Sequence, residues 1–228
     1  MPAYRWRIVV TLCVVAVASC GPREPQAVSP PVEAPRAVTA TSQPRIVVLG
    51  DSLTAGLGIQ QEEAYPAVLQ EYLREKGYRF EVVNAGVSGD TSAGGLRRLE
   101  WAFEGDVRIL ILALGANDGL RGLPVEEMKR NLSEIIERAR RRGVAVLLVG
   151  MEAPPNYGER YTRAYHQAFR ELARERDVTF VPFLLEGVAA VPELNQADGL
   201  HPTAIGARKV ADHLWPTLER MVEASRTP

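Results

Sequence analysis

The chain has 228 residues, of which 46% are hydrophobic, so it is long enough to bury one substantial core and its length favours a single domain. Its formal net charge at pH 7 is -1, with 27 Lys and Arg residues against 28 Asp and Glu residues. Because there is no basic excess, the composition argues against nucleic acid as a partner.

The first part of the chain, residues 1–20, is predicted to be a bacterial signal peptide. Its apolar stretch, residues 8–18, is too short to span a bilayer as a permanent helix. The last four residues, 17–20, resemble a lipobox, in which Cys20 is lipidated and becomes the first residue of the mature protein. This interpretation places the protein in the bacterial cell envelope, lipid-anchored and facing the periplasm or the exterior. The alternative is cleavage after Ala18, which would release a soluble periplasmic protein.

A proline-rich segment, residues 21–44, follows the leader and is predicted to be a flexible linker, because it shows no hydrophobic periodicity. Residues 45–228 then form the predicted catalytic domain. Both cysteines, Cys13 and Cys20, precede this domain. The sequence therefore excludes disulfides, thiolate metal sites and a cysteine nucleophile from it.

From residue 45 onward, short apolar runs alternate with longer stretches of helical periodicity. This alternation is typical of a parallel sheet covered by helices on both faces. Strands are predicted at Arg45–Leu49, Phe80–Asn84, Val107–Leu114, Val144–Gly150 and Val178–Val181. The predicted fold class is therefore α/β, with five parallel strands in a three-layer α/β/α arrangement.

Helices are predicted between the strands. The clearest one follows Pro124, where apolar residues recur at helical spacing until Gly143 ends the pattern. Another is predicted around Tyr161–Arg176. The last helix is predicted to run through residues 210–221, bent or interrupted by Pro216.

Unusual polar and small residues follow the predicted strands, at Ser52, Gly86, Asn117, Asp198 and His201. Because ligands bind at the carboxyl ends of strands in such sheets, we expect these residues to converge. Together they are suited to acyl transfer, with Ser52 as nucleophile, His201 as general base and Asp198 orienting the imidazole. The predicted oxyanion donors are the backbone N–H groups of Ser52 and Gly86 and the side-chain amide of Asn117.

Each of these features also has a structural interpretation, since Gly, Asp, Ser and Asn favour turns and Asp-x-x-His can cap a helix. Only their joint order favours catalysis. Asp51 and Asp118 are predicted to hold local backbone rather than to act as catalytic acids. His166 and His213 lie inside predicted helices. Because no two histidines are close in sequence, no metal site is predicted.

The residues Ser52, Gly86, Asn117 and His201 resemble the four blocks of the SGNH or GDSL hydrolase family, with Asp198 completing the triad. Three further segments are similar to the bacterial arylesterase, acyl-CoA thioesterase and lysophospholipase branch of that family: Asn84–Thr91, Gly119–Leu123 and Pro154–Gly158. The resemblance covers nearly all of residues 45–215.

The resemblance implies a flavodoxin-like sheet of order 2-1-3-4-5 and a cofactor-independent serine esterase acting on carboxylic esters, thioesters or lysophospholipids. It also implies a mobile lip over the acyl chain, formed by Gly119, Leu120, Arg121, Gly122 and Leu123. The expected partners are a small-molecule acyl ester and, through Cys20, a membrane, and we expect a monomer. Two alternatives remain, a carbohydrate or cell-wall deacetylase of the same family and a non-catalytic lipid-binding lipoprotein.

Overall fold

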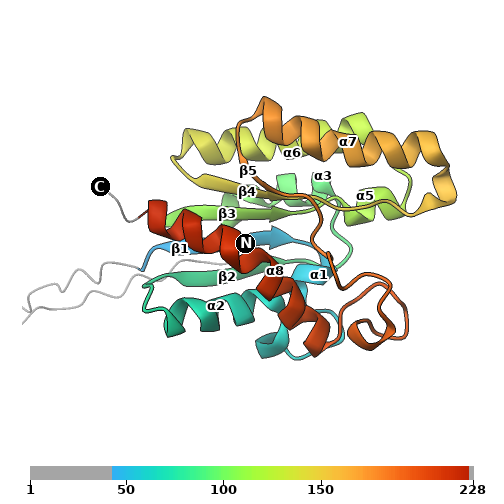
Figure 1. Ribbon diagram of the computed structural model, residues 1–228. Helices are drawn as coiled ribbons and strands as arrows, with labels where there is room; N and C mark the ends of the chain where they lie inside the picture. The colour runs from blue at the N-terminus through green and yellow to red at the C-terminus, as the bar shows by residue number, and fades with distance from the viewer. Residues whose placement is uncertain (1–42, 226–228) are drawn as a thin grey trace, which may run out of the picture. The chain divides into compact units, whose positions relative to one another are not determined.

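Figure 1 shows a computed structural model of the chain, which describes residues 43–225. The predicted signal peptide with Cys20 lies outside the described residues, as does the predicted linker up to residue 42. Within the described part of the chain, no helix combines the length and the apolar character needed to cross a bilayer.

The five predicted strands are all present and form one parallel sheet with the order β2-β1-β3-β4-β5, which confirms the predicted fold. Each strand begins and ends no more than two residues from its predicted limits. The strands are β1 (Arg45–Gly50), β2 (Glu81–Gly86), β3 (Val107–Ala113), β4 (Ala145–Val149) and β5 (Thr179–Val181).

Helices cover both faces of this sheet. One face carries α2 (Tyr65–Glu75) and α8 (Ala204–Ala224), and the other carries α3 (Ser92–Arg97), α6 (Val125–Arg141) and α7 (Glu159–Glu175) (Figure 1). The central strand β3 is enclosed on both sides, and every residue from Ile109 to Ala113 is fully buried. This double burial explains why the strands appear in the sequence as continuous apolar runs without alternation.

The long helices match their predicted patterns closely. The apolar stripe of α6 is buried, and its outer face carries an ion pair in which Arg138 Nε lies 2.7 Å from Glu134 Oε1. The last helix is predicted to be bent or interrupted at Pro216, and the structure excludes the interruption, because α8 continues through this residue. Residues on both sides of the proline, including Leu214 and Leu218, are fully buried, so tertiary packing outweighs the lost backbone hydrogen bond.

Short helices begin directly at the carboxyl ends of the strands. They include α1 (Ser52–Ala55) after β1 and α5 (Ala116–Leu120) after β3, with α4 (Leu99–Ala102) following α3. Single 3-10 turns lie at Gln61–Glu63, Pro155–Tyr157 and Pro192–Leu194. A Cβ atom on Gly86 would lie 2.3 Å from the backbone nitrogen of Ala55. The end of β2 therefore packs directly against the backbone of α1.

Because this contact is between two backbones, we expect Gly86→Ala to displace α1 and to lower the free energy of unfolding by about 1–3 kcal/mol. Urea denaturation measures this loss. The neighbouring variant Val87→Ala is the control, since Val87 is exposed and its truncation should cost less than about 0.5 kcal/mol. Equal stability of Gly86→Ala and the wild type would contradict the packing argument.

Candidate active site

Ser52 is the first residue of α1, directly after the turn that ends β1. Asp51 forms the N-cap of this helix, and its Oδ1 accepts a hydrogen bond of 3.0 Å from the backbone N–H of Leu53. The N–H groups of a first helical turn have no intrahelical acceptor. The Ser52 N–H accordingly has no hydrogen-bond acceptor among residues 43–225.

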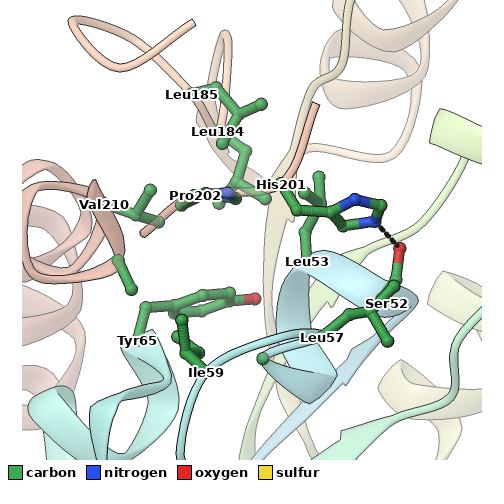
Figure 2. Close-up of a pocket in the computed structure, with 12 residues that line it drawn as sticks. Ser52, Leu53, Leu57, Ile59, Tyr65, Leu184, Leu185, His201, Pro202 and Val210 are labelled. Atoms are coloured by element: carbon green, nitrogen blue, oxygen red, sulfur yellow. Dashed lines mark hydrogen bonds between the residues drawn. The ribbon is translucent and has the colours of Figure 1, made fainter. Parts of the chain in front are cut away.

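The structure brings Ser52, His201 and Asp198 into one hydrogen-bonded chain. The Nε2 atom of His201 lies 2.9 Å from Ser52 Oγ (Figure 2). The Nδ1 atom of the same ring lies 2.6 Å from Asp198 Oδ2. With Nδ1 carrying the proton that is donated to the carboxylate, Nε2 presents its lone pair to the serine hydroxyl. The arrangement can therefore remove a proton from Ser52.

Asp198 is held in its ionised form by local hydrogen bonds. Its Oδ1 accepts the backbone N–H groups of His201 at 3.0 Å and Leu200 at 2.9 Å. The backbone N–H of His201 makes the largest contribution, followed by the His201 side chain, and together they hold the pKa of Asp198 well below its usual range. Asp198 is thus a carboxylate at any working pH and can stabilise a positive imidazolium.

The loop that carries His201 is fixed by side chains that the sequence analysis did not identify. Asn195 donates to the backbone oxygens of Val188 at 2.6 Å and Val191 at 2.8 Å. Gln196 Nε2 donates to Leu57 O at 2.7 Å and to Pro202 O at 2.9 Å. Gln196 thereby ties the histidine loop to the segment that follows Ser52.

Asn117 lies in the first turn of α5, and its amide is oriented by a neighbouring turn. Its Nδ2 donates to Asp90 O at 3.0 Å and lies 3.5 Å from Asp51 Oδ2. Asp90 is in turn fixed by Arg98, whose Nε lies 2.5 Å from Asp90 Oδ2 and whose Nη2 donates to Gly50 O at 2.8 Å. One N–H of the Asn117 amide therefore donates to Asp90 O, while the other makes only the long contact with Asp51 Oδ2.

Gly86 conflicts with its predicted role as a free oxyanion donor. Its N–H already donates to Asn84 Oδ1 at 3.0 Å, and Asn84 Nδ2 donates to Thr54 O at 2.9 Å. Its missing side chain makes room for α1 instead. Gly89, in the turn closed by Asp90 N–H and Val87 O, has an N–H with no acceptor among the described residues. Its left-handed φ of 82° was not visible as a signal in the sequence.

The segment predicted as a lip, Gly119–Leu123, is held by hydrogen bonds from two tyrosine side chains and by one from its own Arg121 side chain. The hydroxyl of Tyr157 donates to Leu120 O at 3.0 Å, and that of Tyr161 donates to Leu123 O at 2.9 Å. Arg121 Nη2 donates to Gly89 O at 2.8 Å. The side chain of Leu120 stays exposed. The segment therefore lies beside the Asn117 end of the site.

Two buried carboxyl groups next to the site make structural contacts. Asp118 accepts hydrogen bonds from Ser92 N at 2.8 Å and Ser92 Oγ at 2.6 Å, and burial raises its pKa. Asp51 is fully buried, and desolvation raises its pKa from 3.8 to about 6, against the opposing effects of the Leu53 N–H and of His201. No cluster of three or more His, Cys, Asp or Glu side chains suited to a metal ion occurs within residues 43–225.

A serine hydroxyl in contact with a histidine that contacts a carboxylate, at the carboxyl edge of a three-layer α/β/α sheet, is the arrangement of a serine hydrolase. The sequence matches the model of the GDSL-like lipase/acylhydrolase family over residues 48–209. The chain belongs to this family and is a carboxylic ester hydrolase.

The chain is similar to curated relatives along most of their length. It is 41% identical to Esterase TesA of Pseudomonas aeruginosa, covering 78% of this chain and 89% of that protein. It is 40% identical to an arylesterase of Vibrio mimicus, covering 69% and 80% of the two chains. It is 35% identical to thioesterase 1/protease 1/lysophospholipase L1 of Escherichia coli K12, covering 80% and 87%.

Solved structures show the same architecture. A crystal structure of TesA superposes with a TM-score of 0.75 at 42% identity and covers 78% of this chain and 99% of that one. The esterase EstA from Pseudoalteromonas sp., inhibited by monoethylphosphonate, gives a TM-score of 0.73 at 31% identity, covering 78% and 98%. In both comparisons the aligned region covers nearly the whole of the relative but only part of this chain.

The raised pKa of Asp51 predicts a pH-dependent effect of Asp51→Asn. The folded protein holds this proton more tightly than the unfolded chain, so the contribution of Asp51 to wild-type stability falls as the pH rises from about 4 to 6. The amide cannot titrate but keeps an oxygen for the Leu53 N–H.

We therefore expect the stability of Asp51→Asn relative to the wild type to rise by on the order of 3 kcal/mol between pH 4 and pH 7. Urea unfolding of both proteins at the two pH values measures it. A stability difference that is the same at pH 4 and pH 7 contradicts the assignment.

Proposed function

We propose that the chain hydrolyses carboxylic esters through an acyl-enzyme formed on Ser52. The observation that supports this most directly is the continuous hydrogen-bonded chain from Asp198 through His201 to Ser52 Oγ. His201 takes the serine proton while Oγ attacks the ester carbonyl, and it then gives that proton to the departing alcohol. A water molecule, deprotonated by His201, attacks the acyl-enzyme, and the acid leaves as Ser52 regains its proton.

The negative charge on the carbonyl oxygen needs donors that are already in place. We assign this role to the Ser52 N–H, which has no acceptor within residues 43–225, and to the Asn117 amide. Asp90 O orients this amide by accepting one of its N–H groups, and the other makes only the 3.5 Å contact with Asp51 Oδ2. For the third donor we assign the N–H of Gly89 in place of Gly86. The hydrogen bond from Gly86 to Asn84 would have to break before Gly86 could take part, whereas Gly89 has no such bond.

The substrate is proposed to be an ester or thioester with alkyl groups rather than an acetylated sugar. Apolar side chains, among them Leu53, Ile59 and Val210, line the pocket beside Ser52 and offer few partners for sugar hydroxyls (Figure 2). The relatives named arylesterase and thioesterase 1/protease 1/lysophospholipase L1 support aryl esters, thioesters and lysophospholipids as substrates to test.

Replacing Ser52 by alanine tests the function itself. We expect Ser52→Ala to lower kcat for p-nitrophenyl butyrate by about 10⁴-fold or more and to abolish labelling by a fluorophosphonate. Ser133→Ala is the matched control, since Ser133 lies in α6, outside the residues assigned to the site, and should keep full activity and labelling. Hydrolysis by Ser52→Ala at the wild-type rate would show that Ser52 is not the nucleophile.

We further propose that the protein is anchored to a membrane of the cell envelope by a lipid on Cys20. The support is the sequence at residues 17–20, since the structure does not describe this segment. The proposed linker, residues 21–44, would at full extension of roughly 3.1 Å per residue let the catalytic domain reach about 70 Å from the membrane.

Metabolic labelling with an alkyne fatty acid tests the anchor. We expect the wild type to be labelled and membrane-bound and Cys20→Ala to lose both properties. Cys13→Ala is the matched control, because this cysteine lies inside the apolar stretch of the same leader and should leave labelling intact. A mature protein that begins at Ser19, as shown by mass spectrometry, would establish release instead of anchoring.

A further inference from the structure

A narrow pocket opens beside Ser52 on the side of the His201 ring (Figure 2). One wall comes from the segment after the nucleophile, with Leu53, Leu57 and Ile59. The other comes from the segment after β5 and from α8, with Leu184, Leu185 and Val210. The back of the pocket is fully buried at Leu184, whereas Leu57 stands at the rim with 47% of its surface exposed.

The lining of this pocket selects for an uncharged, apolar occupant. Among the lining residues, only Ser52, His201 and Tyr65 carry polar side-chain atoms. The Tyr65 hydroxyl is already paired, since it lies 2.7 Å from Thr54 Oγ1 in a buried contact. An alkyl group loses no hydrogen bond on entering such a pocket, whereas a hydroxyl or a charge would go unpaired.

The chemistry of the reaction identifies which part of the ester lies here. In the tetrahedral intermediate the carbon bonded to Ser52 Oγ carries an oxyanion, an acyl group and an alkoxy group. The oxyanion faces the donors at Asn117 and the Ser52 N–H. His201 must pass its proton to the alkoxy oxygen as the carbon–oxygen bond breaks, so the alkoxy group has to lie on the His201 side.

We infer that this pocket binds the alkyl group of the departing alcohol or thiol, a conclusion that rests on the proposed esterase function. The acyl chain then lies on the opposite side, along Gly119–Leu123. None of those five residues, and not Asn117, contributes to the pocket lining. Because the pocket is narrow, it favours the esters of short, unbranched alcohols.

Two series of esters separate the alcohol site from the acyl site. In the first, the acyl group is butyryl and the alcohol is ethanol, butanol or hexanol. In the second, the alcohol is ethanol and the acyl group is acetyl, butyryl or octanoyl. Titration of the released acid gives kcat/KM, which includes the step in which the alcohol departs.

The variants Leu57→Ala and Ile59→Ala widen the pocket from its rim. We expect each to raise the ratio of kcat/KM for hexyl butyrate over ethyl butyrate by about tenfold. The ratio for ethyl octanoate over ethyl acetate should change less than about twofold, because the acyl chain does not enter the pocket. Each ratio is internal to one variant, so a smaller folded fraction cancels.

Leu120→Ala provides the matched control on the other side of the site. Leu120 is 42% exposed, close to the value for Leu57, and belongs to the segment Gly119–Leu123. Its truncation should change the acyl ratio and leave the alcohol ratio within about twofold.

Alcoholysis gives an independent measurement. When p-nitrophenyl butyrate acylates Ser52, an added alcohol competes with water, and its attack forms the new ester while the hydroxyl proton passes to His201. Because this step is the reverse of alcohol departure, the alcohol must occupy the same pocket. We expect Leu57→Ala to raise the yield of hexyl butyrate relative to ethyl butyrate from equal concentrations of the two alcohols.

The possible outcomes are distinct. A shift in the acyl ratio with an unchanged alcohol ratio in Leu57→Ala overturns the inference and assigns the pocket to the acyl chain. No shift in either ratio also overturns it, since the pocket then does not contact the substrate. In both cases the esterase function stands. Absence of ester hydrolysis by the wild type, or full activity of Ser52→Ala, would instead remove the proposed function and this inference with it.

Discussion

The site depends on the abrupt change from strand to helix between Gly50 and Ser52. The chain can turn here because Asp51 closes the first turn of α1 with its own carboxylate, accepting the Leu53 N–H at 3.0 Å. Arg98 stabilises the end of β1 by donating a hydrogen bond to Gly50 O. The serine is thus fixed at the sheet edge with its N–H free. Burial of the Asp51 carboxyl group disfavours its ionised form, and its pKa is raised for this reason.

Two carboxyl groups near His201 consequently serve different purposes. Asp198 is half exposed and saturated with N–H donors, which keeps it ionised and in contact with the ring. Asp51 is buried and shares its oxygens between the Leu53 N–H and, at longer range, the Asn117 amide. Its charge and that of a protonated His201 attract each other. In this geometry Asp198 orients the His201 ring and can stabilise its charged form, whereas Asp51 shapes the serine turn.

Local patterns made the strands and the long helices predictable, because apolar runs and helical periodicity reflect burial directly. The convergence of Ser52, Asp198 and His201 could also be predicted, since the carboxyl ends of parallel strands lie at one edge of the sheet. The sequence could not show that Gln196 bonds to Leu57 O, because this contact joins loops 139 residues apart that meet only in the final fold. The same holds for Gly86, whose N–H partner depends on how Asn84 packs against α1.

The order of the sheet explains why His201 reaches Ser52 on a long loop. Asn117 follows β3, a direct neighbour of β1, so the proposed oxyanion donor reaches Ser52 from an adjacent strand end. Asp198 and His201 follow β5, which β3 and β4 separate from β1. Residues 182–203 must therefore run back across the sheet edge before α8 begins, and in doing so they place Leu184 and Leu185 beside the serine. The long return that carries His201 to Ser52 thus also builds one wall of the apolar pocket, so base and pocket lie on the same side of the nucleophile.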